Sequence, residues 1–248
     1  MTDLTLLQLY PDELGVAGDR GNVMAIRVRL EHAGHTVTVV CHTVGADLPH
    51  AVDLILVGNG PLSAMRNVHG DLLRVAEKLG SFRASGVPLF AYGSGAELLG
   101  NSITLQDGST LAGLGLLPFH ATRVAERTVG YVVIDTPFGQ VVGFEDNASM
   151  WVLEPSATPL GILEVGGGNG SGQVEGVLDG SAIATQVGGP VLPLNPLLTD
   201  AIIAFMASRR GFATETTGVG DSNVDLEQYA ARAREVILSN AKHVFSRI

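Results

Sequence analysis

Apolar positions fall into two patterns along the first hundred residues. Short runs rich in Val, Ile and Leu predict strands that are buried on both faces. These runs cover residues 4–10, 35–41, 52–57 and 88–92. Between them, apolar residues at helical spacing predict helices over residues 22–31 and 71–82. Strands that alternate with helices in this way predict a mostly parallel sheet with helices on both faces.

The pattern changes after residue 100, where short strands and turns follow one another. A hairpin is predicted over residues 103–110, with its turn at Asp107-Gly108. The other elements expected here are a second hairpin over residues 131–135 and 140–144, strands over 161–165 and 181–187, and a helix over 197–210. The glycine-rich run 166–172 is predicted to be a flexible loop. We therefore expect antiparallel strands to be added to the parallel sheet.

The C-terminal part of the chain predicts an appendage. Residues 1–211 have the length and pattern of one large α/β domain. A linker rich in Gly, Thr and Ser then runs from Ala213 to Asn223. It leads to an amphipathic helix over residues 224–245. We expect residues 212–248 to pack on the domain or on a partner.

Composition narrows the classes of partner and compartment. The chain is 46% hydrophobic and 16% charged, so it has enough apolar residues for a sizeable core. The net charge is −10 and no basic run occurs, which argues against nucleic acid and anionic membranes as partners. No signal peptide or membrane span is predicted. The single cysteine, Cys41, excludes an internal disulfide, fits a cytoplasmic protein, and is predicted to be a small buried residue.

Residues 87–100 form the stretch with the clearest geometric meaning. A buried strand over residues 88–92 is followed by the hinge Gly93-Ser94-Gly95 and by a helix that is predicted to begin at Ala96. A sharp strand-to-helix turn is typical of a nucleophile elbow, which holds a reactive side chain above a sheet beside backbone N–H groups that bind an oxyanion. The apex residue here is Gly93, which has no side chain to react.

Several short segments recur together in one protein family. They are residues 19–22, 57–60, 91–97 with 99–100, 111–116, 142–145, 167–169 and 189–193 with 195–196. In their order and spacing, the sequence resembles the class I glutamine amidotransferases of the CobB/CobQ type. Within them it is most similar to the GatD-type glutaminase subunits of lipid II isoglutaminyl synthases. The resemblance covers nearly the whole chain and implies a flavodoxin-like three-layer sandwich.

The resemblance also implies where a glutaminase site would lie. The family uses a cysteine nucleophile and a histidine base, and these positions correspond to Gly93 and Gly188 in this chain. Arg127 matches the arginine that holds glutamine. The turn Gly58-Asn59-Gly60 matches the oxyanion side of the pocket, with Asn59 where glycine is usual. Both halves of the catalytic pair are therefore predicted to be absent.

Other chemistry has weaker support. Ser94 follows the apex residue and is a possible relocated nucleophile, although Tyr92 breaks the Gly-x-Ser-x-Gly pattern and capping the next helix is a more ordinary role. The histidines lack the spacing of metal ligands. The loop with Gly15, Gly18 and Gly21 does not have the dinucleotide-binding pattern. No metal or cofactor is predicted.

Three hypotheses about function follow. The first is a catalytically inactive amidotransferase-like subunit that acts as a scaffold or regulator. For it, the resemblance implies a partner like the Mur-ligase-type synthetase subunit that receives ammonia in the active family. The second is a binding module for an amino acid or another carboxylate, which would use Arg127 and a pocket widened by two lost side chains. The third is a hydrolase that uses Ser94.

Overall fold

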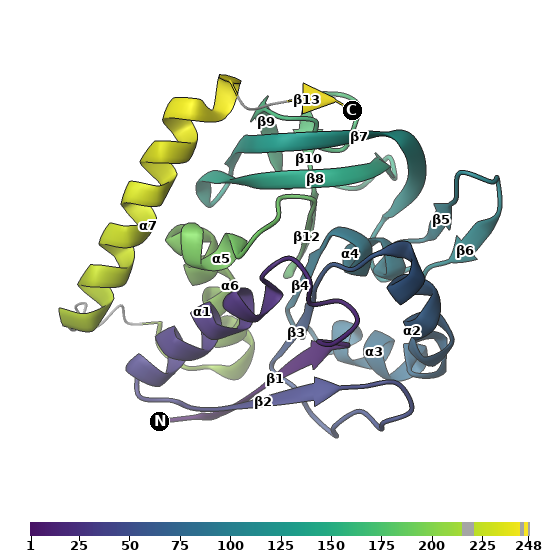
Figure 1. Cartoon of the computed structure of the whole chain (residues 1–248). Coiled ribbons are helices and arrows are strands. Elements are labelled where there is room, and N and C mark those ends of the chain that lie inside the picture. Colours follow the sequence, from purple (N-terminus) through teal and green to yellow (C-terminus); the bar gives the residue numbers. More distant parts are fainter. Residues whose placement is uncertain (215–220, 244–245, 248) are drawn as a thin grey trace.

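A six-stranded sheet forms the centre of the molecule in the computed structural model, which describes residues 1–214, 221–243 and 246–247 (Figure 1). Its strands are β11 (Val177–Asp179), β12 (Ala182–Thr185), β4 (Leu89–Tyr92), β3 (Leu54–Val57), β1 (Asp3–Leu9) and β2 (Thr36–His42), in that spatial order. All neighbouring strands are parallel apart from β11 and β12. The predicted mostly parallel sheet is thus confirmed.

Helices cover both faces of this sheet. One face carries α1 (Asp19–His32), α5 (Val191–Leu194) and α6 (Pro196–Arg210), and the other carries α2 (Leu62–Arg74), α3 (Ala76–Ala84) and α4 (Gly93–Leu99). The alternation of β1 shows why both faces are needed, because Leu4 and Leu6 pack with the first group of helices while Leu7 and Leu9 pack with the second. The three-layer α/β architecture is as predicted.

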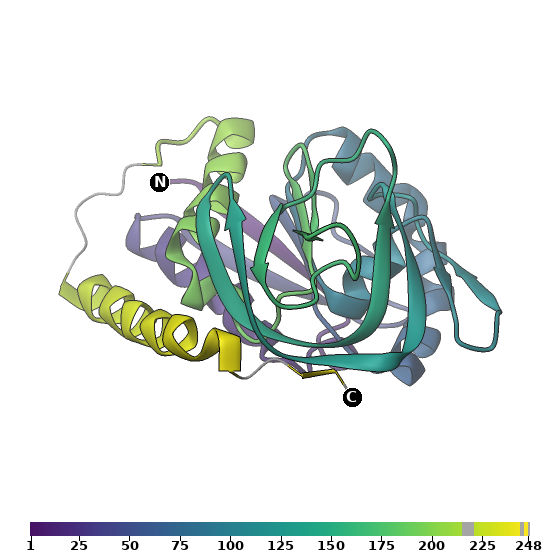
Figure 2. The same cartoon turned by 90° about the horizontal axis from the view of Figure 1, so that it is seen from above.

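A second, mostly antiparallel sheet lies beside the first (Figure 2). It contains β5 (Ser102–Thr104), β6 (Thr110–Ala112), β7 (Phe119–Thr136), β8 (Gly139–Leu153), β9 (Gly161–Val165), β10 (Val174–Glu175) and β13 (Ser246–Arg247). The hairpin predicted over residues 103–110 is confirmed. The second hairpin is much longer than predicted. Its ladder is irregular between Arg123 and Thr128, so the alternating pattern that identifies strands is lost there.

Two predicted elements differ in their bounds. The helix predicted over residues 71–82 begins earlier, at Leu62 after the extended Pro61, and breaks at Val75 into α2 and α3. The helix predicted from Ala96 begins directly at Gly93. In both cases glycine or proline marks a helix start that the apolar spacing alone does not locate.

Two predictions about local environment were wrong. Cys41 is exposed, because it lies on β2 at the edge of the sheet. The loop over residues 166–172 is held in place: the buried Glu145 carboxylate accepts the backbone N–H groups of Gly167 and Gly168, and Asn169 bonds the backbone of Gly176.

The C-terminal helix α7 (Asp221–Asn240) lies along one side of the body and continues into the short helix η1 (Ala241–His243) (Figure 1). Arg234 anchors α7 by donating to Asn195 Oδ1 and to the Gln140 carbonyl oxygen. The predicted end of the helix at Phe245, and most of the predicted linker, fall outside the described residues. In the part of the chain that is described, no helix combines the length and apolarity that a bilayer crossing requires.

Candidate functional site

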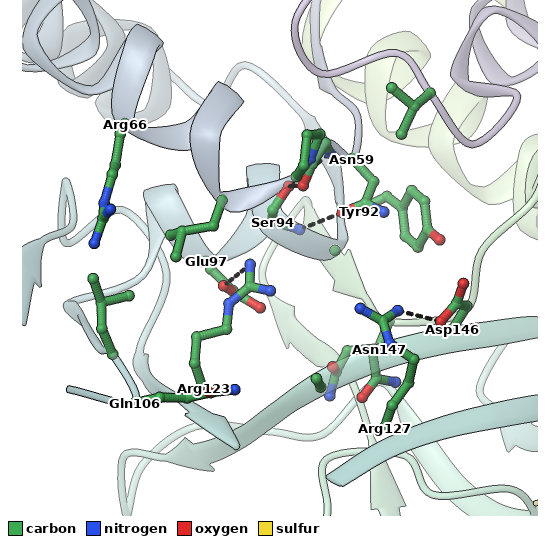
Figure 3. Close-up of a pocket in the computed structure, with 18 of the residues that line it drawn as sticks. Asn59, Arg66, Tyr92, Ser94, Glu97, Gln106, Arg123, Arg127, Asp146 and Asn147 are labelled. Atoms are coloured by element: carbon green, nitrogen blue, oxygen red, sulfur yellow. Dashed lines mark hydrogen bonds and ion pairs between the residues drawn. The ribbon is translucent and has the colours of Figure 1, made fainter. Parts of the chain in front are cut away.

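A cavity of about 570 Å³ opens at the carboxyl ends of β3 and β4 (Figure 3). Because neighbouring parallel strands end at the same edge of a sheet, the turn after β3 and the turn after β4 meet there. Asn59 and Gly60 come from the first turn, and Gly93 and Ser94 from the second. The β7–β8 pair and the β5–β6 hairpin form the other walls.

Gly93 lies at the strand-to-helix turn with a backbone φ of +54°. Glycine adopts this conformation without strain. A Cβ atom at this position would lie 2.5 Å from Asn59 Oδ1. The same oxygen accepts the backbone N–H of Ser94 at 2.9 Å. The Asn59 amide thus occupies both the space in front of residue 93 and the hydrogen-bonding direction of the next N–H group.

The hydroxyl of Ser94 is buried and fully engaged. Its Oγ donates to the carbonyl oxygen of Gly60 and accepts the Gly60 N–H, both at 2.8 Å. The predicted helix-capping role is wrong, since α4 has no side-chain cap. No histidine lines the cavity within the described residues, so no imidazole base adjoins this hydroxyl. Ser94 instead ties the turn after β4 to the turn after β3.

Gly188 faces the ring of Tyr92. A Cβ atom at residue 188 would overlap the Tyr92 hydroxyl. Tyr92 is only 5% exposed, and burial, with the charges of Asp19 and Asp146, raises the pKa of this phenol, so the hydroxyl stays neutral. The expectation that two lost side chains widen the pocket was therefore wrong at both glycines, because Asn59 and Tyr92 fill the space.

Gly188 does not line the first cavity. It lines a second, apolar one of about 650 Å³ between α1, α5, β8 and α7. Tyr92 lines the first cavity and reaches Gly188 with its hydroxyl, so its side chain lies where the two cavities approach each other.

The irregular part of β7 aims two arginines at the first cavity. Residues 124–127 of β7 oppose only Ala148 of β8, so the ladder bulges and both Arg123 and Arg127 line the cavity wall. Arg123 forms an ion pair with Glu97 at 2.7 Å. Burial raises the pKa of the Glu97 carboxyl, while the charge of Arg123 opposes that shift.

Arg127 pairs with Asp146 at the mouth of the cavity, where both side chains are about half exposed (Figure 3). The resemblance places a glutamine carboxylate at Arg127. The structure brings Arg127, Asn59, Gly60, Gly93 and Ser94 to one cavity. The glutamine-binding role itself stays a prediction.

The remaining predicted residue, Gly58, does not line the cavity, and a Cβ atom there would meet the Asp19 carboxyl group. The resemblance places residues 146–148 at a wall of the pocket, and all three line the cavity. Sequence reasoning missed four other lining residues, namely Arg66, Tyr92, Glu97 and Arg123. Only Glu97 carries a signal in the sequence, since it is an acidic residue inside an otherwise apolar segment. Among the described residues, no group of three or more His, Cys, Asp or Glu side chains is placed to hold a metal ion.

Comparison with known proteins relates this geometry to one family. The family model described as "CobB/CobQ-like glutamine amidotransferase domain" matches residues 10–195. The chain is 27% identical to the Lipid II isoglutaminyl synthase (glutamine-hydrolyzing) subunit GatD of Staphylococcus aureus, over 97% of both chains. It is 25% identical to the subunit of the same name from Streptococcus pneumoniae, over 81% of this chain and 79% of that protein.

A solved glutamine amidotransferase structure has the same fold. It superposes with a TM-score of 0.54 at 16% identity and covers 83% of this chain and 99% of its own.

Proposed function

This chain belongs to the CobB/CobQ-like glutamine amidotransferase family, and we propose that it acts there as a non-catalytic subunit. Glutamine hydrolysis in the family requires a thiolate to attack the amide, a base to handle the proton and N–H groups to hold the oxyanion. Gly93 and Gly188 supply neither thiolate nor base. Loss of a nucleophile and base together costs on the order of 10⁶-fold in turnover, by analogy with protease triads.

One observation carries the proposal: Asn59 Oδ1 accepts the Ser94 N–H that would otherwise face an oxyanion. The amide oxygen carries partial negative charge and competes with a substrate oxyanion for the same donor. A chain that had lost only its nucleophile would keep this donor open. Here the oxyanion side and the nucleophile side of the site are both closed to the family reaction.

We place the function in a complex. The two relatives are named as subunits of a lipid II isoglutaminyl synthase. By that similarity, this chain serves as scaffold or regulator of a Mur-ligase-type synthetase in the cytoplasm, in cell-wall or related amidation. Such a role requires the family fold but does not require glutamine hydrolysis.

The test has two arms. Affinity purification of the full chain from its native cell is expected to recover a Mur-ligase-type chain in stoichiometric amount. The reconstituted complex is expected to amidate with ammonium but not with glutamine as the nitrogen source. Glutamine-supported amidation, or recovery of the chain as a lone monomer, would contradict the proposal.

A binding module is the second candidate, favoured by the retained cavity with its polar walls. A hydrolase that uses Ser94 has less support. The hydroxyl is buried and makes both of its hydrogen bonds to Gly60, and the described cavity lining offers it no histidine.

A further inference from the structure

The charged groups of the first cavity are not equivalent, and their difference points to a ligand. Arg66 projects from α2 on one side of the cavity, and Arg127 projects from β7 on the other (Figure 3). The Arg123–Glu97 pair lies between them. Arg66, Arg127 and the Arg123–Glu97 pair have different surroundings, so they differ in their capacity to bind a ligand.

The Arg123–Glu97 pair is fixed. Glu97 is 2% exposed, and its carboxylate lies 2.7 Å from Arg123, which also contacts Met65 Sδ. Separating such a pair would leave a buried charge uncompensated. We therefore expect this pair to stay intact when a ligand binds and to add no net charge to the cavity.

The Arg127–Asp146 pair is exchangeable. Both side chains are about half exposed, and exposed ion pairs contribute little to stability. A ligand carboxylate can replace Asp146 at Arg127 while a ligand ammonium group takes Asp146. A free α-amino acid presents both groups on one carbon, so its head group matches this end of the cavity.

Arg66 is the available cation. In the part of the chain that the structure describes, its guanidinium makes no hydrogen bond and no ion pair within 4 Å, although it acts electrostatically on Asp107 of the β5–β6 hairpin. An exposed guanidinium that faces a cavity binds a carboxylate well and a neutral amide poorly. Beside Arg127, Asn147 also lines the cavity, and its buried Nδ2 has no hydrogen-bond partner (Figure 3).

We propose that the cavity binds an acidic α-amino acid, with its head group at Arg127 and Asp146 and its side-chain carboxylate directed to Arg66. The inference rests on the second candidate function. It separates the ligand from glutamine, whose side-chain amide has nearly the shape of the glutamate carboxylate but carries no charge to pair with Arg66.

The experiment is isothermal titration calorimetry on the full chain at fixed ionic strength. L-glutamate and L-α-aminoadipate test two side-chain lengths, L-glutamine removes the charge, and glutarate removes the amino group. At least one acidic amino acid is expected to bind ten-fold or more tightly than both glutamine and glutarate. Equal affinity for glutamine and both acidic amino acids, or no detectable binding of any probe, would overturn the proposal.

Arg66→Gln identifies the residue that discriminates. The variant is expected to reduce the affinity for the acidic amino acid to that for glutamine while leaving glutamine binding unchanged. Arg20→Gln is the matched control, because Arg20 is exposed and lies outside the cavity lining; it is expected to bind like the wild type. Discrimination that survives in Arg66→Gln would contradict the assignment.

These readouts do not depend on the proposed subunit role. A chain that binds no amino acid would still copurify with a synthetase if the first proposal holds. A chain that releases ammonia from glutamine would refute the first proposal whatever its affinity for glutamate.

Discussion

The hydroxyl of Tyr92 occupies the space into which a Cβ atom on Gly188 would project. Tyr92 is the last residue of β4, and Gly188 follows the end of the neighbouring parallel strand β12. A large side chain at one strand end is thus accommodated by the absence of a side chain at the other. The resemblance places a histidine base at residue 188, so the structure shows what fills that space in this chain.

This pairing predicts strong coupling between the two positions. Gly188→Ala alone is expected to destabilise the fold by about 1–3 kcal/mol, because overpacking forces Tyr92 to move. In a Tyr92→Ala background, the same substitution is expected to cost at least about 1 kcal/mol less. Urea denaturation of the double-mutant cycle measures the coupling.

Gly80→Ala is the control for that cycle. Gly80 lies within α3, and a Cβ atom there would have no neighbour within 4 Å. The substitution is expected to be neutral or to stabilise the helix by up to about 1 kcal/mol. If Gly188→Ala lowers the free energy of unfolding equally with and without the Tyr92 side chain, the contact with Tyr92 is not the reason why residue 188 must be glycine.

Restoring the two catalytic residues alone is not expected to rebuild a glutaminase. Gly93→Cys with Gly188→His is expected to remain inactive, because Asn59 and Tyr92 still fill the site. Adding Asn59→Gly and Tyr92→Ala is expected to raise ammonia release from glutamine at least ten-fold over the two-residue variant. Comparable activity in the two- and four-residue variants would mean that neither side chain obstructs the site.

The sequence predicts the centre of the parallel sheet well because β3, β4 and β12 are buried on both faces. β3 and β4 are apolar or aromatic and buried at every position, a pattern that is typical of strands covered on both faces. The irregular ladder of β7 has no such signature. Between Arg123 and Thr128 the side chains no longer alternate between two faces, so the sequence pattern there resembles a loop.

The candidate site was predicted only in part, for a physical reason. Gly93 was located because a strand, a glycine turn and a helix are consecutive in sequence. The residues that fill the site are not consecutive in sequence with the glycines that they contact. Asn59 and Tyr92 act on Gly93 and Gly188 through contacts between different strands. A single sequence does not show which side chains face one another across a sheet edge.

Ser94→Ala separates a structural role from a catalytic one. The hydroxyl joins both backbone groups of Gly60, and its loss leaves a buried N–H and a buried C=O with one partner fewer. We expect a loss of about 1–3 kcal/mol in unfolding free energy and no change in background ammonia release. Ser239→Ala, at an exposed serine of α7, is expected to change neither quantity; a fall in ammonia release specific to Ser94→Ala would favour the hydrolase.

The buried carboxyl of Glu175 predicts a pH-dependent stability. Burial raises the pKa of Glu175 to about 7, and the charge of Glu145 acts in the same direction, while hydrogen bonds from the Gln186 N–H and the Thr185 hydroxyl oppose the shift. In the unfolded chain a glutamate has a pKa of about 4.3. Between these two values the folded chain holds a proton that the unfolded chain has lost.

The free energy of unfolding is therefore expected to fall as the pH rises from about 4.5 to about 7, by an amount on the order of 3 kcal/mol from this residue. Burial also raises the pKa of Asp19, to about 6, which adds to the slope. Glu175→Gln is expected to remove the Glu175 part, and Glu126→Gln, at an exposed position, to keep the full slope. Urea denaturation of the wild type and both variants between about pH 4.5 and pH 7 measures these slopes.

Arg234 fixes how firmly the C-terminal helix is attached. Its guanidinium donates to Asn195 Oδ1 and to the Gln140 carbonyl, and Asn195 in turn bonds both backbone groups of Val142 in β8. Arg234→Ala removes the polar anchor, and over residues 227–240 the apolar contacts that remain include the buried Ala230 and the partly buried Ile237. Hydrogen exchange in residues 227–240 is expected to accelerate about 5- to 30-fold, which corresponds to about 1–2 kcal/mol. Exchange in β1, β3 and β4 is expected to be unchanged.

Arg232→Ala is the control, because Arg232 lies at an exposed position on the same helix. It is expected to exchange like the wild type. Equal exchange in Arg234→Ala and Arg232→Ala would show that α7 is held by apolar contacts alone.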